Sequence, residues 1–173
     1  MSEFFSNYGF LRLDNFLEKQ NYESVLRVAR KLRWQKLKQP DLFSYSLGKV
    51  NKDFVQEFEF EELANFIARF VKFKEMNLKL KLYSHRDYTL VQKKNLKAEF
   101  FIYFPILAKP RRAWEDRFGG YKCYVDSEGK SLIFPVKKNS FALLNGRHFS
   151  GFTKYVNHLA TKSSLFVVEG EVL

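Results

Sequence analysis

The segment YSHRDYTLVQKK, residues 83–94, contains two side chains of types that bind metal ions. His85 offers an imidazole nitrogen and Asp87 a carboxylate, with a single residue between them. Residues two apart in a β-strand project to the same side, so a strand here would present both groups to one ion. With three His and six Asp in the chain, this spacing arises by chance roughly one time in ten, so by itself it is only suggestive.

Other catalytic chemistries have weaker support in the sequence. No nucleophile elbow is present, and Cys123, the single cysteine, has no evident partner base. The chain has no glycine-rich phosphate loop, and one Cys with three His does not give zinc-site spacing. A site built on His85 and Asp87 is therefore the enzymatic hypothesis.

Periodicity predicts the elements that would position these residues. An alternating stretch near residues 10–13 is followed by a helix with Val25, Ala29 and Leu32 on its buried face. Residues 35–53 indicate a connection or irregular strands, and a second helix buries a stripe of Leu63, Phe66, Ile67 and Phe70. From Leu78 the period becomes two, in eight short strands: 78–84, 87–91, 97–104, 119–125, 130–136, 140–145, 152–156 and 163–172.

This order predicts one α+β domain over residues 1–173, with a sandwich or barrel in its second half. The 46% hydrophobic and 18% aromatic content excludes a disordered chain. In the strand at 119–125, Cys123 is expected to be a small buried residue.

Several motifs, in this order, resemble the iron(II)- and 2-oxoglutarate-dependent dioxygenases, particularly their prolyl-hydroxylase-like branch. The resemblance covers nearly the whole chain and is carried by LRLDNFLEK (11–19), LKLYSHRDYTLVQ (80–92), AEFFIYFP (98–105), Trp114 with Glu115, FGGYKCYVD (118–126) and IFPVKKNSFALLN (133–145). It implies a double-stranded β-helix, which is a jelly-roll or cupin-like barrel, with an N-terminal strand and two supporting helices.

The resemblance also implies a ligand set and a reaction. In one register His85, Asp87 and His148 hold Fe(II), while Lys162 and Tyr103 bind 2-oxoglutarate. The chain would then be an oxygenase that hydroxylates an unknown substrate.

A second register, counted from Tyr83, puts the paired ligands at Gln92 and Lys94 instead. Counting back from Lys162 puts the third ligand near Phe152. An ammonium has no lone pair and a phenyl ring has no donor atom, so neither Lys94 nor Phe152 can bind iron. In this register the barrel would be a catalytically inactive binding module, and the sequence leaves both registers open.

Net charge bears on partners and location. The formal charge of +11 favours a polyanionic partner, such as an acidic protein or RNA, although a solubilised lysine-rich surface gives the same number. The single cysteine and the absence of a secretory signal or a membrane-length apolar run predict a cytoplasmic protein without a membrane partner.

Overall fold

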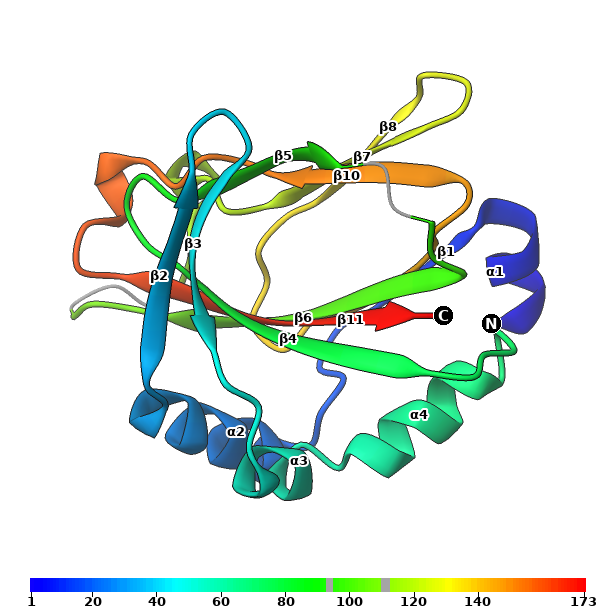
Figure 1. Ribbon diagram of the computed structural model, residues 1–173, viewed down its shortest axis with the longest axis horizontal. Helices are drawn as coiled ribbons and strands as arrows, with labels where there is room; N and C mark the ends of the chain where they lie inside the picture. The colour runs from blue at the N-terminus through cyan, green and yellow to red at the C-terminus, as the bar shows by residue number, and fades with distance from the viewer. Residues whose placement is uncertain (93–94, 110–112) are drawn as a thin grey trace.

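The computed structural model describes residues 1–92, 95–109 and 113–173 (Figure 1). The helices within these residues are α1 (Ser2–Tyr8), α2 (Lys19–Lys31), α3 (Lys52–Glu57), α4 (Phe60–Ala68) and the short 3-10 helices η1 (Asp116–Phe118) and η2 (His158–Ala160). The strands are β1 (Phe10–Leu13), β2 (Trp34–Gln39), β3 (Phe43–Gly48), β4 (Met76–Tyr83), β5 (Tyr88–Gln92), β6 (Ala98–Ile106), β7 (Lys122–Asp126), β8 (Ser131–Phe134), β9 (Phe141–Asn145), β10 (Phe149–Thr153) and β11 (Ser164–Val172).

The strands form one antiparallel sheet that curls on itself. Its order is β1-β9-β6-β11-β4-β3-β5-β10-β7-β8, and β2 pairs with β3 at an edge. The long strand β11 lies between β4 and β6, while β5, β10 and β7 lie across the barrel from them (Figure 1). This arrangement is a double-stranded β-helix, so the predicted fold is confirmed.

Helices α2, α3 and α4 cover the outer face of the β4–β11–β6 layer (Figure 1). The alternation in β4 directs Leu80 toward these helices, where it is fully buried. From the opposite side α2 contributes Val25 and Ala29, as predicted, and α4 contributes Leu63 and Ile67. The result is an apolar helix-side core.

A second core fills the barrel interior. On the inner face of the same strands Phe101 and Val167 are buried, and Phe134 packs edge-on against Phe101 at 5.4 Å between ring centroids. The connection after β6 closes over this core through Trp114, whose indole N–H donates to the Gly119 carbonyl at 2.9 Å. Both faces of the β4–β11–β6 layer are therefore buried.

The structure departs from the sequence expectations in several elements. Residues 34–48, within a segment expected to be a connection or irregular strands, form the regular hairpin β2–β3, and two further helices, α1 and α3, are present. Strand β10 begins at Phe149 rather than at residue 152, because it pairs with β7 over Phe149–Thr153. Residues 154–156 have left the strand, and the Val156 amide donates to the Asp87 carbonyl at 2.8 Å.

Strand β7 faces the opposite way from the expectation for Cys123. Lys122 and Tyr124 are buried, whereas Cys123 between them is partly exposed. The prediction of a buried Cys123 is wrong, because it assumes that the lysine of an alternating strand faces water.

None of the helices in the described residues combines the length and apolar character needed to span a bilayer.

Candidate functional site at the centre of the barrel

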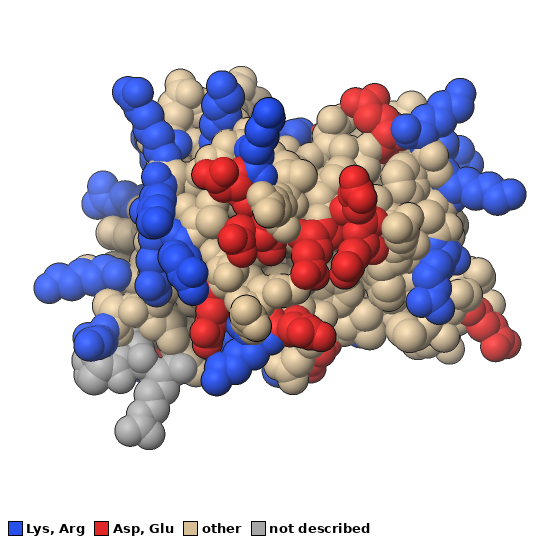
Figure 2. All heavy atoms as spheres, turned by 90° about the horizontal axis from the view of Figure 1, so that it is seen from below, with Lys and Arg blue, Asp and Glu red and all other residues tan. Residues whose placement is uncertain are grey.

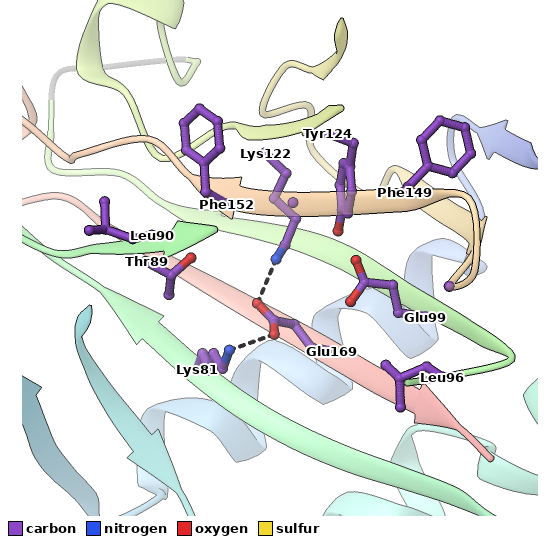
Figure 3. Close-up of a pocket in the computed structure, with 12 residues that line it drawn as sticks. Lys81, Thr89, Leu90, Leu96, Glu99, Lys122, Tyr124, Phe149, Phe152 and Glu169 are labelled. Atoms are coloured by element: carbon purple, nitrogen blue, oxygen red, sulfur yellow. Dashed lines mark ion pairs between the residues drawn. The ribbon is translucent and has the colours of Figure 1, made fainter. Parts of the chain in front are cut away.

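Three charged side chains meet in the barrel interior (Figure 3). The ammonium of Lys81 lies 2.7 Å from Oε2 of Glu169, and that of Lys122 lies 2.8 Å from Oε1. Each of the three side chains is about nine-tenths buried. We call Lys81, Glu169 and Lys122 the central triad.

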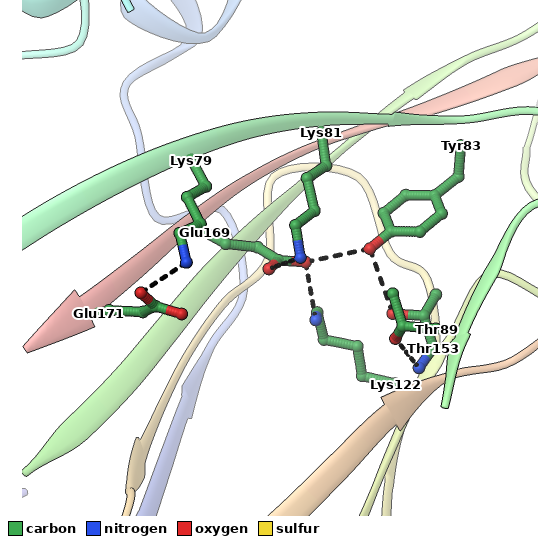
Figure 4. Close-up of polar contacts among 8 residues, drawn as sticks. All are labelled: Lys79, Lys81, Tyr83, Thr89, Lys122, Thr153, Glu169 and Glu171. Carbon is green, nitrogen blue, oxygen red and sulfur yellow. Dashed lines mark hydrogen bonds and ion pairs between the residues drawn. The ribbon is translucent and has the colours of Figure 1, made fainter. Parts of the chain in front are cut away.

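The pairing of strands places the central triad. Lys81 on β4 is opposite Val167 of β11, so Glu169, two residues further along β11, is its diagonal neighbour on the inner face. Lys122 reaches the same carboxylate from β7 across the barrel (Figure 4). The central triad therefore joins the two sides of the barrel.

Hydroxyl groups extend this network toward β5 and β10. The phenol of Tyr83 donates to Oε1 of Glu169 at 3.3 Å, and the Thr153 hydroxyl donates to the phenol oxygen at 3.5 Å. The Thr153 amide donates to the Thr89 hydroxyl at 2.8 Å where β10 pairs with β5 (Figure 4). These groups form a continuous polar path inside the barrel.

The space left beside the network is small. The cavity lined by the central triad, Glu99 and Tyr124 has a volume of about 40 Å³, which is room for a few water molecules. Pockets that bind small molecules usually enclose roughly 300–1,000 Å³. Side chains, rather than open space, fill the barrel centre.

Burial and charge act differently on the two lysines. Burial lowers the pKa of Lys122, and the nearby Glu169 carboxylate only partly compensates. Burial also disfavours charge on Lys81, but attraction and hydrogen bonding from Glu169 outweigh it and raise the pKa of Lys81. The positive charge of Lys81 lowers the pKa of Lys122 further, and the Glu99 carboxylate acts in the opposite direction on both lysines. Burial also raises the pKa of Tyr83 well above its usual value.

The structure does not bring the three predicted iron ligands together. His85 is exposed in the turn between β4 and β5, beside the Thr153 end of β10, where the Arg86 amide donates to the Val156 carbonyl. His148 is exposed directly before Phe149, at the opposite end of β10. A five-residue strand is about 15 Å long. Side chains at its two ends are too far apart for both imidazoles to bind one ion.

The third predicted ligand, Asp87, is buried in a structural network. Its Oδ1 accepts from the Ser44 hydroxyl at 2.7 Å and from the Lys36 ammonium, and its Oδ2 accepts from the Ser84 amide at 2.9 Å. These contacts fasten the β4–β5 turn to the β2–β3 hairpin. Among the described residues, no group of three His, Cys, Asp or Glu side chains is placed to hold a metal ion.

The two predicted 2-oxoglutarate contacts lie in different environments. Lys162 is exposed, in a turn between η2 and β11. Tyr103 lies inside the barrel, where its hydroxyl donates to the Phe134 carbonyl at 3.1 Å and accepts from the Lys122 amide at 2.9 Å. Both hydrogen bonds of the Tyr103 hydroxyl are thus made with backbone groups. Its contact with 2-oxoglutarate stays a prediction.

Residues of the second register lie at β5 and β10. Gln92 ends β5, and Lys94 lies outside the described residues. Phe152 lies on β10, and its ring points away from Glu169 (Figure 3).

Sequence reasoning missed the central triad. The available signal was Glu169, a carboxylate within the apolar strand LFVVEGEV, together with lysines that alternate with leucines in LKLKLY. Buried charges are usually paired, so a carboxylate in an apolar strand indicates a cation on a nearby strand.

No family model matches the sequence, and no curated protein resembles it at the sequence level. Its fold, by contrast, is similar to several solved structures. A prolyl-4-hydroxylase from Pseudomonas putida superimposes with a TM-score of 0.73 at 10% identity, covering 99% of this chain and 95% of that one. A prolyl hydroxylase from Trichoplax adhaerens, solved with a hypoxia inducible factor peptide, gives 0.77 at 10% identity, covering 99% and 86%.

A third similar structure is HygX from Streptomyces hygroscopicus, solved with nickel, 2-oxoglutarate and hygromycin B. It gives a TM-score of 0.65 at 12% identity and covers 98% of this chain and 85% of that one. Such likenesses establish the fold of the 2-oxoglutarate and iron(II) oxygenases for this chain. Activity has to be argued from its own residues.

Those residues do not fit iron and 2-oxoglutarate in the predicted manner. The two histidines are exposed at opposite ends of β10, Asp87 is held by three other groups, and the barrel centre carries the central triad. A dicarboxylate would have to displace Glu169 from both lysines before it could bind there.

Proposed function

We propose that this chain is a binding module with the oxygenase fold and without oxygenase activity. The single observation that carries the proposal is the central triad, which occupies the interior where a ligand would have to enter. An oxygenase needs open coordination positions on its metal and room for a cosubstrate. The remaining cavity of about 40 Å³ has no room for a cosubstrate of the size of 2-oxoglutarate.

The oxygenase prediction keeps its support from the similar structures, because all of those described are named as hydroxylases or crystallised with 2-oxoglutarate. The contacts of Asp87 and the positions of His85 and His148 count against it. Fold likeness at about a tenth identity is weaker evidence about a site than the side chains that would form it.

Anaerobic reconstitution tests the proposal. Purified protein is incubated with Fe(II), with and without 2-oxoglutarate, and its iron content and melting temperature are measured. A ligand present at a hundred times its dissociation constant stabilises the folded state by about 2.7 kcal/mol, which raises the melting temperature by several degrees. We expect no stoichiometric iron and no such rise.

Two single variants locate any metal that does bind. His85→Ala and His148→Ala change exposed side chains, so both variants are expected to fold and to behave as the parent protein does. Stoichiometric iron in the parent that is lost in His85→Ala, together with succinate formed from 2-oxoglutarate, would refute the proposal and restore the oxygenase hypothesis.

A further inference from the structure

Cationic side chains crowd one end of the molecule, where α2 ends and β2 begins. Residues 27–40 contain six Lys or Arg and no Asp or Glu. Arg30 and Lys31 lie in the last turn of α2, Arg33 follows, and Lys38 lies on β2, all of them exposed. In Figure 2 acidic side chains gather in the middle of the helix-bearing face, and Lys and Arg side chains are densest toward its left end.

Two further segments bring positive charge to the same end. Arg86 is exposed in the β4–β5 turn, which is fastened to β2 through Asp87 and Lys36. Lys154 is exposed directly after β10, and the neighbouring Val156 exchanges backbone hydrogen bonds with Arg86 and Asp87. We call this surface the basic end, and its residues are Arg30, Lys31, Arg33, Lys38, Arg86 and Lys154.

Two tyrosines lie among these cations. Tyr88 follows Arg86 by two residues, and Tyr155 follows Lys154 directly. Their ring centroids are 6.4 Å apart, and Tyr155 is 42% exposed. Exposed aromatic rings beside a cationic surface are the platforms on which single-stranded nucleic acids stack their bases. The carboxylates of an acidic protein gain nothing comparable from a stacking surface.

The helix dipole alone explains only some of the cations of the basic end. Positive charge in the last turn of a helix is stabilised by the helix dipole, which accounts for Arg30 and Lys31. It does not account for Lys38 on a strand, for Arg86 in a turn, or for Lys154 after β10. Nor does it explain why an exposed tyrosine lies at the same place.

We infer that the basic end binds single-stranded nucleic acid, with its cations on the phosphates and Tyr155 stacked on a base. The inference rests on the proposed function, because it supplies the partner of the binding module. Arginine suits this role, since its planar guanidinium can donate two parallel hydrogen bonds to one phosphate.

Fluorescence anisotropy with a labelled oligouridine RNA of about 15 nucleotides tests the inference, since one site of this kind covers roughly 4–16 nucleotides. We expect binding at low salt, with a logarithm of affinity that falls linearly with the logarithm of salt concentration. Unlabelled polyglutamate of equal charge should compete poorly. If polyglutamate competes as well as the RNA, an acidic protein becomes the better partner and the inference fails.

Matched variants separate a site from general attraction. The double variant Arg86→Glu and Lys154→Glu should weaken binding at least about tenfold and flatten the salt dependence. The control, Lys72→Glu and Lys74→Glu, makes the same charge change in the exposed connection between α4 and β4, at the other end of the molecule (Figure 1). It should weaken binding less than about threefold. Equal effects would overturn the inference.

Tyr155→Ala tests stacking without changing charge. It should weaken RNA binding about tenfold and leave the salt dependence as it is. Tyr8→Ala, which removes a tyrosine that is 60% exposed on α1, should have no effect. RNA binding unaffected by Tyr155→Ala, or no RNA binding by the parent protein at low salt, would refute the inference. The iron measurements decide the proposed function independently, because they involve none of these residues.

Discussion

The two faces of the β4–β11–β6 layer are both buried, yet they are built from different chemistry. On the helix side, Leu80, Phe104 and Phe166 pack against α2 and α3 in a largely apolar core. On the barrel side, the same strands contribute Lys81 and Glu169 alongside Val167. Burial alone therefore does not distinguish the two regions. They differ because the buried charges on the barrel side need oppositely charged partners, whereas the apolar side chains on the helix side do not.

The two regions differ in their contribution to stability and in what they allow the interior to bind. Apolar side chains gain free energy simply by leaving water. Buried charges lose the free energy of hydration, and only well-placed partners offset that loss. The net contribution of a buried ion network to stability is therefore small or negative. The helix-side core is then the main source of stability, and the central triad determines what the interior can hold.

Glu169→Ala should have the largest effect, because it leaves two buried ammonium groups without their shared carboxylate. Removing one partner of a buried ion pair costs about 3–5 kcal/mol of folding free energy. Urea unfolding followed by circular dichroism measures the loss. A loss below 1 kcal/mol would mean that water reaches the lysines and that the barrel centre is open.

Leu80→Ala should cost slightly less, about 3 kcal/mol, within the range of 2–5 kcal/mol for truncating a buried leucine. Leu80 is fully buried on the helix side, next in the chain to Lys81, so the two variants compare the faces at one point of β4. The same unfolding measurement applies. If Leu80→Ala lowers the free energy of unfolding far more than Glu169→Ala does, the barrel side contributes less to stability than its burial suggests.

Replacing the whole central triad should act in the opposite direction. The triple variant Lys81→Met, Glu169→Leu and Lys122→Met removes all three charges and keeps similar volume, and we expect it to be neutral or about 1–3 kcal/mol more stable. A strongly destabilised triple variant would show that the ion pairs themselves support the fold. Its RNA binding should equal that of the parent protein.

The smallest effect concerns tyrosines and appears only at alkaline pH. Burial raises the pKa of Tyr83, Tyr103 and Tyr124 well above the usual 10.0. Because the pKa is higher in the folded state, the stability from the neutral phenols is fully present below pH 10 and is lost as pH rises through the folded pKa. Absorbance at 295 nm should therefore show these phenols ionising only as the protein unfolds. Their ionisation near pH 10 in folded protein would indicate an open barrel.

Much of the fold was predictable, because periodicity reports burial well. The stripe with Val25 and Ala29 identified α2, and the period-two stretches located most strands from β4 to β11 to within a few residues. The regular hairpin β2–β3 was not predicted because the exposure pattern of β2 does not alternate: its half-buried side chains, Trp34 and Leu37, are three residues apart. The predicted position of β10 was three residues too late, because pairing with β7 rather than the local sequence sets where the strand begins and ends.

The site was harder to predict for a physical reason. Alternation of Lys with Leu in β4 is the pattern of a strand with one face exposed to water, and nothing local indicates that the opposite side of the barrel covers that face. His85 and Asp87 are two residues apart, as a metal pair requires, but they fall in a turn rather than on a strand. Their directions depend on the turn, which carries Arg86 at a φ of 74°.

The contact of Lys122 with Glu169 also ties one side of the barrel to the other. Because β7 and β11 lie on opposite sides and share this ion pair, any widening of the barrel breaks it. The amides of the two strands should then exchange with solvent together, as one cooperative unit, rather than strand by strand. On this expectation the barrel opens as a whole or stays closed.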